Sequence, residues 1–197
     1  MSVENLYSNR KLQNVPNMIM IGSTARNSGK TALAAAVIDK YKLNHPVAAL
    51  KVTTIAEKNG KCIRGGDGCG TCSSLKGNFE LKEETKSAGN KDTAILLASG
   101  AQKVYWLKVL KSHMQAGFKE LISLMPANTL IVCESNSLRK VVEPGVFVML
   151  KTARDNKIKE SAAEVMSLAD IVYENNLEDD FACLINEIEH RMKLQKT

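Results

Sequence analysis

Residues 17–41 decide the fold, and they read NMIMIGSTARNSGKTALAAAVIDKY. The compact apolar run Asn17–Ile21 predicts a buried strand, and the alanine-rich segment Ala32–Tyr41 predicts a helix. Between them, residues 24–31 have the spacing T-x-x-x-x-G-K-T, which is typical of a loop that binds phosphate groups. Because strand, loop and helix follow one another in register, this segment predicts nucleotide binding.

The residue types of this loop suit phosphate chemistry. A glycine lets the backbone approach phosphate oxygens, while consecutive N–H groups and the helix N-terminus supply a positive concavity. We expect Lys30 to reach the β- and γ-phosphates and the Thr31 hydroxyl to bind Mg²⁺. The usual first glycine is replaced by Thr24, with Gly22 two residues earlier. The residues expected to contact the nucleotide here are Arg26, Asn27, Ser28, Gly29, Lys30, Thr31 and Ala32.

Short apolar runs alternate with helical patterns along the rest of the chain, which predicts a parallel sheet covered by helices. The further strands are expected at Val47–Lys51, Lys103–Val109, Thr129–Cys133, Val146–Leu150 and Ile171–Tyr173. The further helices are expected at Thr93–Ser99, Ala116–Met125, Ser161–Leu168 and Asp179–Lys193, the last with Asp179 and Asp180 as N-terminal caps. The sequence therefore predicts one α/β domain over residues 1–197, with three layers and a mainly parallel sheet.

Composition excludes several classes of protein. The 197 residues are 44% hydrophobic and 24% charged, which is typical of a globular domain. No stretch approaches the ~18 apolar residues of a membrane-spanning helix, and the N-terminus lacks the pattern of a secretory signal. We therefore expect a cytoplasmic protein with no membrane partner. Although the net charge is +6, Lys and Arg are spread along the chain and aromatics make up 5%, which disfavours a nucleic-acid partner.

Polar side chains at three strand ends complete the expected site. Glu134 follows an apolar strand and is expected to lie near the Mg²⁺ and phosphates, where it would hold metal-bound water or a reacting group. Lys51 ends the second strand and would reach the same crevice. Asn175 and Glu178 have the spacing of a guanine-binding pair, in which the carboxylate accepts the ring N–H and amino group. A solvated polar turn is the alternative interpretation of this last pair.

Together these motifs resemble the molybdopterin-guanine dinucleotide biosynthesis protein B family, over about residues 18–134. The resemblance rests on the phosphate loop, the lysine-ended second strand and the segment Lys91–Ala101, which reads KDTAILLASGA. In that family a Lys-Asp-Ser/Thr segment leads a helix that ends in Gly-Ala, and a strand with a terminal Glu follows. The family belongs to a dimeric P-loop class that includes dethiobiotin synthetases and metallocentre-maturation NTPases.

The resemblance implies a GTP-binding, weakly hydrolysing accessory protein of cofactor assembly, acting as a homodimer. Carried over by position, Gly29, Lys30 and Thr31 would bind phosphate and Mg²⁺, while Lys51, Asp92 and Glu134 would line the reacting crevice. Two departures point to a divergent branch that serves another metallocofactor. The family's Glu-Gly is here Glu-Ser-Asn at 134–136, and a cysteine-containing insertion replaces a histidine-bearing stretch.

The interval of about 53–90 is this insertion, in which we assign no strand or helix. It contains Cys62, Cys69 and Cys72 among glycines, a setting that suits a Zn or Fe–S site with one ligand position open. A redox dithiol and unreactive loop thiols are the alternatives. Cys133 and Cys183 are expected in the core, and the three histidines are given no role.

These observations favour a Mg²⁺-dependent nucleoside triphosphatase, with GTP preferred to ATP, that supports metallocofactor maturation. In this mechanism Lys30 holds the phosphates, and a water near Glu134 attacks the γ-phosphate in line. Two alternatives stay open: an ATP-dependent ligase or kinase of the dethiobiotin-synthetase kind acting on a small organic acceptor, and a non-catalytic nucleotide- or metal-binding sensor.

Overall fold

The structure is a computed structural model of the full chain. It describes residues 12–55, 75, 77–152, 158–176 and 180–193, together with the backbone of 57–58 and 61–62.

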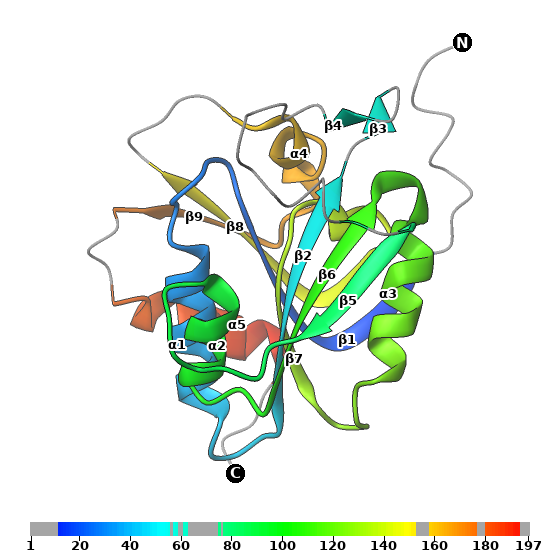
Figure 1. Ribbon diagram of the computed structural model, residues 1–197. Helices are drawn as coiled ribbons and strands as arrows, with labels where there is room; N and C mark the ends of the chain where they lie inside the picture. The colour runs from blue at the N-terminus through cyan, green and yellow to red at the C-terminus, as the bar shows by residue number, and fades with distance from the viewer. Residues whose placement is uncertain are drawn as a thin grey trace.

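A seven-stranded sheet forms the centre of the molecule, with the order β5-β6-β2-β7-β1-β8-β9 (Figure 1). Six of the strands are parallel, and β5 pairs antiparallel with β6 at one edge. The strands are β1 (Gln13–Ser23), β2 (Val47–Ile55), β5 (Phe79–Glu83), β6 (Lys103–Leu110), β7 (Leu130–Glu134), β8 (Val142–Thr152) and β9 (Ile171–Asn175). A separate two-stranded sheet pairs β3 (Glu57–Lys58) with β4 (Lys61–Cys62).

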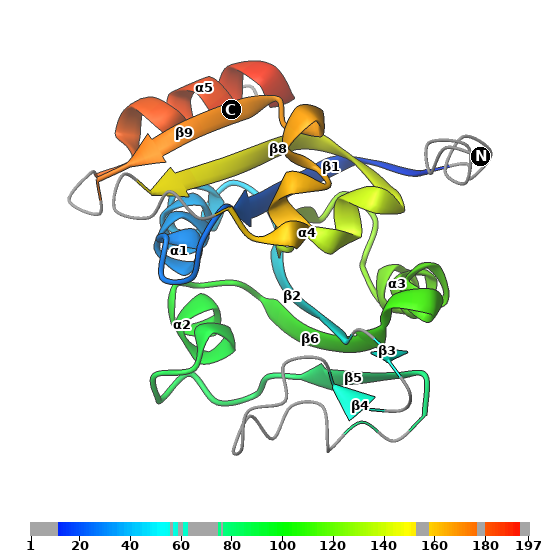
Figure 2. The ribbon, with the colours of Figure 1, turned by 90° about the horizontal axis from the view of Figure 1, so that it is seen from above.

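Helices cover both faces of the sheet and make three layers, as Figure 2 shows with α1 and α2 on one side and α3 on the other. The first face carries α1 (Lys30–Tyr41), α2 (Asp92–Ala98) and α5 (Ala182–Met192). The second face carries α3 (Met114–Ser123), α4 (Glu160–Ala163) and the short 3₁₀ segment η3 (Ser137–Lys140). Two further 3₁₀ segments are η2 (Lys111–His113) and η4 (Met166–Leu168).

Burial explains why the first strand and helix form where they do. The six residues from Met18 to Ser23 are all buried, as expected of a strand that is covered on both faces. In α1 the buried side chains recur at the spacing of one helical face, namely Leu33, Ala34, Val37, Ile38 and Tyr41. The predicted strand–loop–helix unit is therefore present, and the predicted α/β architecture with a mainly parallel sheet is confirmed.

Three local predictions were wrong. The interval 53–90 contains the end of β2 and all of β5, whose Phe-Glu-Leu-Lys-Glu sequence alternates as a half-buried edge strand does. The helix expected over Ser161–Leu168 is instead the single-turn α4 followed by η4. The last helix begins at Ala182 rather than Asp179, because Phe181 has a left-handed backbone with φ of 58°. Phe181 therefore occupies the N-cap position, where no side chain caps the helix, although Asp180 Oδ1 accepts the N–H of Ala182 at 3.0 Å.

None of the helices in the described part of the chain has the length and apolar character of a membrane-crossing helix.

Candidate functional site

The chain leaves two neighbouring strands, β1 and β7, toward opposite faces of the sheet. After β1 it enters α1, whose apolar side chains pack in the cluster of the first face. After β7 it enters η3, whose Leu138 packs in the cluster of the second face. In open α/β sheets, ligands bind in the crevice that such a divergence opens at the carboxyl ends of the strands. This position is where the sequence predicted the phosphate site.

The β1–α1 loop, residues 24–29, turns sharply into the helix. Asn27 and Gly29 both have left-handed backbones, with φ of 52° and 86°. Gly29 also lies against the amide of Asn175, since a Cβ on Gly29 would be 2.4 Å from Asn175 Nδ2. Conformation and space therefore both require glycine here.

Two asparagine side chains from distant strand ends hold this loop. Asn175, the buried last residue of β9, donates from Nδ2 to the carbonyl of Ser28 at 2.9 Å. Asn136, two residues beyond β7, accepts the N–H of Ser23 at 2.8 Å and donates to the carbonyl of Ser23 at 2.9 Å. The loop is thus fixed at its start and at its end.

Lys30 is the first residue of α1 and extends back along the loop. Its Nζ donates to Ser23 Oγ at 2.9 Å, and that hydroxyl donates to the carbonyl of Ala25 at 2.9 Å. Burial lowers the pKa of Lys30, and the charge of Glu134 opposes this shift. An ammonium group is therefore held, largely out of water, at the N-terminus of the helix.

Glu134 ends β7 in register with Ile21 of β1 and Lys51 of β2. The residue is only 4% exposed, and its Oε1 finds no hydrogen-bond donor within the described residues. A buried carboxylate oxygen without a donor is costly unless a cation or a bound donor satisfies it. This oxygen is the feature of the site that best fits a bound cation.

Lys51 brings a second ammonium group to the same crevice. The prediction that it ends the second strand was wrong, because β2 continues through four more residues to Ile55. Its Nζ is paired with Asp92 Oδ2 at the first residue of α2. Burial lowers the pKa of Lys51, Glu134 raises it, and the nearby charge of Lys30 lowers it further. The structure thus brings together Lys30, Lys51, Asp92 and Glu134, four residues that the sequence singled out.

The remaining predicted site residues differ in their placement. Thr31 is half-buried in the first turn of α1, whereas Arg26, Asn27 and Ala32 are exposed around the loop. Glu178, Cys69 and Cys72 lie outside the described residues, as does the side chain of Cys62. Within the described residues no three His, Cys, Asp or Glu side chains are grouped as metal ligands would be.

The two cysteines expected in the core differ from each other. Cys133 is fully buried in β7, and burial raises the pKa of its thiol. Cys183 is exposed on α5, so its predicted burial was wrong. It lies on the helix face opposite to Leu184, Ile185 and Ile188, which carry the apolar contacts of α5.

Sequence reasoning missed the two residues that connect the loop to β7. The sequence pattern gives Ser23 no role, and Asn136 enters it only as part of a departure from a family pattern. Their contact spans 113 residues of sequence, so no local pattern indicates it. The signal that was available is the unusual Glu-Ser-Asn sequence itself at the end of an apolar strand.

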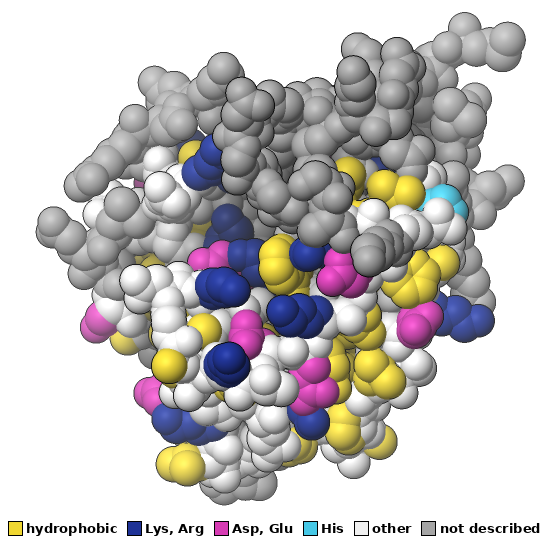
Figure 3. All heavy atoms as spheres, viewed as in Figure 1, with side chains coloured by type: hydrophobic (Ala, Val, Ile, Leu, Met, Phe, Trp, Pro, Cys, Tyr) yellow, Lys and Arg dark blue, Asp and Glu magenta, His cyan; other side chains and the backbone are white. Residues whose placement is uncertain are grey.

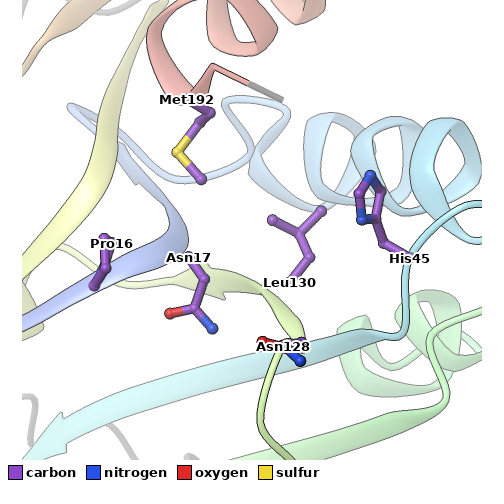
Figure 4. A pocket seen from close by; sticks show the side chains of 6 residues that line it. All are labelled: Pro16, Asn17, His45, Asn128, Leu130 and Met192. Atoms are coloured by element: carbon purple, nitrogen blue, oxygen red, sulfur yellow. The ribbon is translucent and has the colours of Figure 1, made fainter. Parts of the chain in front are cut away.

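The surface around the site is mixed in charge. Figure 3 shows Lys and Arg side chains interspersed with Asp and Glu near the centre of the face that carries α1 and α2. A cavity of about 290 Å³ lies at the opposite end of the sheet, lined by Pro16, Asn17, His45, Asn128, Leu130 and Met192 (Figure 4). Leu130 begins β7 whereas Glu134 ends it, so this cavity is separate from the crevice.

Neither a scan against protein-family models nor a search of curated proteins finds a match to this chain.

Proposed function

We propose that the chain is a P-loop protein that binds a Mg²⁺–nucleoside triphosphate at the β1–α1 loop and hydrolyses it slowly. The observation that carries this proposal is the half-buried Lys30 beside the unsatisfied carboxylate of Glu134, at the crevice between β1 and β7. The Gly-Lys-Thr sequence at the start of α1 supports it independently. So does the strand order, in which the acid-bearing β7 lies directly beside β1.

The residues of the site fit a bound cation. The Thr31 hydroxyl and the Glu134 carboxylate are oxygen donors of the kind that Mg²⁺ prefers, and Glu134 Oε1 lacks another partner in the described structure. When bound, Mg²⁺ would neutralise charge on the phosphate oxygens. In the proposed reaction the loop N–H groups and Lys30 orient the phosphates, and Glu134 orients the attacking water in line with the γ-phosphate.

GTP is the nucleotide that we propose, on the resemblance described above and on the Asn-x-x-Glu spacing of Asn175 and Glu178. A base-binding loop that follows β9 would be coupled to the phosphate loop through the Asn175–Ser28 hydrogen bond. Comparison of GTP with ATP binding tests this choice. We further propose that the protein acts as a homodimer in metallocofactor maturation, with Cys62, Cys69 and Cys72 binding Zn or an Fe–S cluster.

Phosphoryl transfer to a small anionic acceptor is the second candidate reaction. Lys51 favours it, because it places a second, half-buried ammonium group near Lys30 and Glu134. If an organic acid added to the protein is phosphorylated and release of inorganic phosphate falls, the transfer reaction is supported over hydrolysis.

The decisive experiment compares wild type, Lys30→Ala and Lys40→Ala in fluorescent GTP binding and phosphate release with Mg²⁺. Lys40 is the matched control because it lies exposed in the last turn of the same helix. We expect Lys30→Ala to weaken GTP binding by roughly tenfold or more, since it removes a charge-assisted contact, and Lys40→Ala to behave as wild type. Equal behaviour of all three proteins would contradict the proposal, and binding without turnover would leave only a sensor role.

The cysteine proposal is tested on the same preparation. Metal and acid-labile sulfide are measured after anaerobic purification of wild type and of the Cys62→Ser, Cys69→Ser, Cys72→Ser variant. Equal metal and sulfide content in both proteins would contradict a metal role for the three cysteines.

A further inference from the structure

Asn136 makes a reciprocal pair of hydrogen bonds with Ser23, the last residue of β1 before the loop. Its Oδ1 accepts the N–H of Ser23 at 2.8 Å, and its Nδ2 donates to the carbonyl of Ser23 at 2.9 Å. The same Nδ2 lies 3.4 Å from Ser161 Oγ on α4. The Asn136 amide therefore forms hydrogen bonds with both the N–H and the carbonyl of Ser23, the last residue of β1.

The space around this amide is closely filled. A Cβ on Gly22 would lie 2.7 Å from Asn136 Oδ1 and 2.9 Å from the ring of Phe147. Glycine is therefore required at position 22 for steric reasons rather than for a turn, because any side chain would displace the Asn136 amide from the backbone. The glycine before the loop and the asparagine after Glu134 form one structural unit.

Ser23 connects the backbone that Asn136 holds to the side chain of Lys30. Its Oγ accepts from Lys30 Nζ at 2.9 Å and donates to the carbonyl of Ala25 at 2.9 Å, so the hydroxyl has both a donor and an acceptor to align it. Ser23 is only 1% exposed, so water cannot replace these contacts freely. The position of Lys30 Nζ thus depends on the backbone that Asn136 holds.

We propose that Asn136 is a positioning residue, which sets Lys30 relative to Glu134 through Ser23. Glu134 and Asn136 are two residues apart at the end of β7, so one short segment carries the carboxylate and also fixes the loop that orients the lysine. The inference rests on the proposed function, and it identifies a residue on which turnover depends without contact to the nucleotide. It also accounts for the Glu-Ser-Asn sequence at this strand end.

The test measures GTP hydrolysis and GTP binding stoichiometry for wild type, Asn136→Ala and Asn136→Asp. Aspartate keeps the acceptor for the Ser23 N–H but replaces the donor with an oxygen facing the Ser23 carbonyl. We expect both variants to lower kcat roughly ten- to hundredfold, with KM changed less and stoichiometry as in wild type. A merely structural defect would instead lower stoichiometry and kcat together.

Ser135→Ala is the matched control from the same turn. The Ser135 hydroxyl accepts the N–H of Leu138 at 3.1 Å, so it supports the start of η3 rather than the β1–α1 loop. We expect its kcat to equal that of wild type even where its Tm falls as far as that of Asn136→Ala.

A double-mutant cycle that combines Asn136→Ala with Ser23→Ala tests whether Asn136 acts on Lys30 through Ser23. If Asn136 acts through Ser23, the loss of kcat in the double variant equals that of the more affected single variant. The positioning role would be overturned if the kcat loss of the double variant equalled the product of the two single losses. It would also be overturned if Asn136→Ala kept the kcat of wild type. Either result would leave GTP hydrolysis established. Failure of wild type itself to bind GTP would contradict the proposed function instead.

Discussion

At the scale of single residues, Gly29 is constrained both by its left-handed backbone and by its close contact with Asn175. A second glycine in this chain has only the first of these constraints. The φ of 86° at Gly29 disfavours any side chain, and a Cβ would also collide with Asn175 Nδ2 at 2.4 Å. Gly77 has a similar φ of 92°, but no atom of the described residues lies within 4 Å of its added Cβ. The pair therefore distinguishes backbone strain from loss of the contact between β9 and the loop.

We expect Gly29→Ala to lower the free energy of unfolding by about 2–3 kcal/mol and Gly77→Ala by about 1 kcal/mol, because only the first adds a collision to the left-handed strain. Urea denaturation of both variants measures the difference. Equal losses would mean that the amide of Asn175 moves away at little cost, and that it does not hold the end of the loop.

Tyr41 is a buried residue whose hydroxyl finds no hydrogen-bond partner among the described residues. Burial, with a smaller contribution from Glu189, raises its pKa from 10.0 to about 12. The unfolded chain therefore ionises Tyr41 before the folded protein does, and the stability that the neutral form provides is lost as the pH rises from 10 to 12.

Tyr41→Phe removes both the orphaned hydroxyl and this ionisation. We expect the variant to gain roughly 1 kcal/mol at neutral pH, since the cost of burying an unpaired hydroxyl disappears. The gain over wild type should widen between pH 10 and 12, as followed by denaturation at several pH values. A gain that stays constant over this range would show that the tyrosine ionises normally in the folded protein.

At the scale of elements, long uniform patterns were predictable and short or distant ones were not. The strand and helix on either side of the loop were recognisable because burial on both faces of β1 requires an unbroken apolar run, and α1 repeats apolar residues on one face. The five-residue β5 alternates apolar and polar residues, but it lies in an interval rich in glycine and lysine, and its pairing with β6 and packing against α3 are not visible in so short a pattern.

The same distinction applies to the candidate site. Lys30 and Glu134 were predictable because they occupy a helix start and a strand end that the topology brings to one edge of the sheet. Lys51 was expected at a strand end, but β2 continues to Ile55, so Lys51 reaches the crevice from within the strand. The hydrogen bonds of Asn136 and Asn175 to the loop cross 113 and 147 residues of sequence. They depend on the relative placement of whole strands, which a single sequence does not encode in any local spacing.

The packing of α3 against β5 and β6 provides a test at this scale. Gly117 faces the sheet, and a Cβ there would lie 3.2 Å from side-chain atoms of Phe79 and Val109. We expect Gly117→Leu to lower the free energy of unfolding by about 2–3 kcal/mol, because α3 must move away from β5 and β6. Lys119→Leu, on the exposed face of the same helix, should change it by less than about 0.5 kcal/mol in the same denaturation experiment. Similar effects of both changes would contradict the close approach of α3 to the edge strand.

At the scale of the whole molecule, the loop joins parts that belong to different layers. Asn175 reaches it from β9, Asn136 from the η3 side, and Lys30 from α1 on the first face. A ligand that orders the loop must therefore affect all three residues, because their hydrogen bonds hold either the loop or Ser23 immediately before it. The α3–β5–β6 edge and the cavity at the amino end of β7 have no such connection in the described structure.

This arrangement predicts where hydrogen exchange responds to Mg²⁺ and GTP. We expect slower amide exchange in residues 24–34, at the end of β7 and at the end of β9, because binding stabilises the loop and the strand ends that hold it. Exchange in α3 and β5 should change little, because their apolar side chains pack in the cluster on the sheet face opposite to α1. Lys30→Ala, measured with the same nucleotide concentration, is the control in which protection should be lost. Protection centred on the amino-end cavity, or spread evenly over the chain, would contradict binding at the β1–β7 crevice.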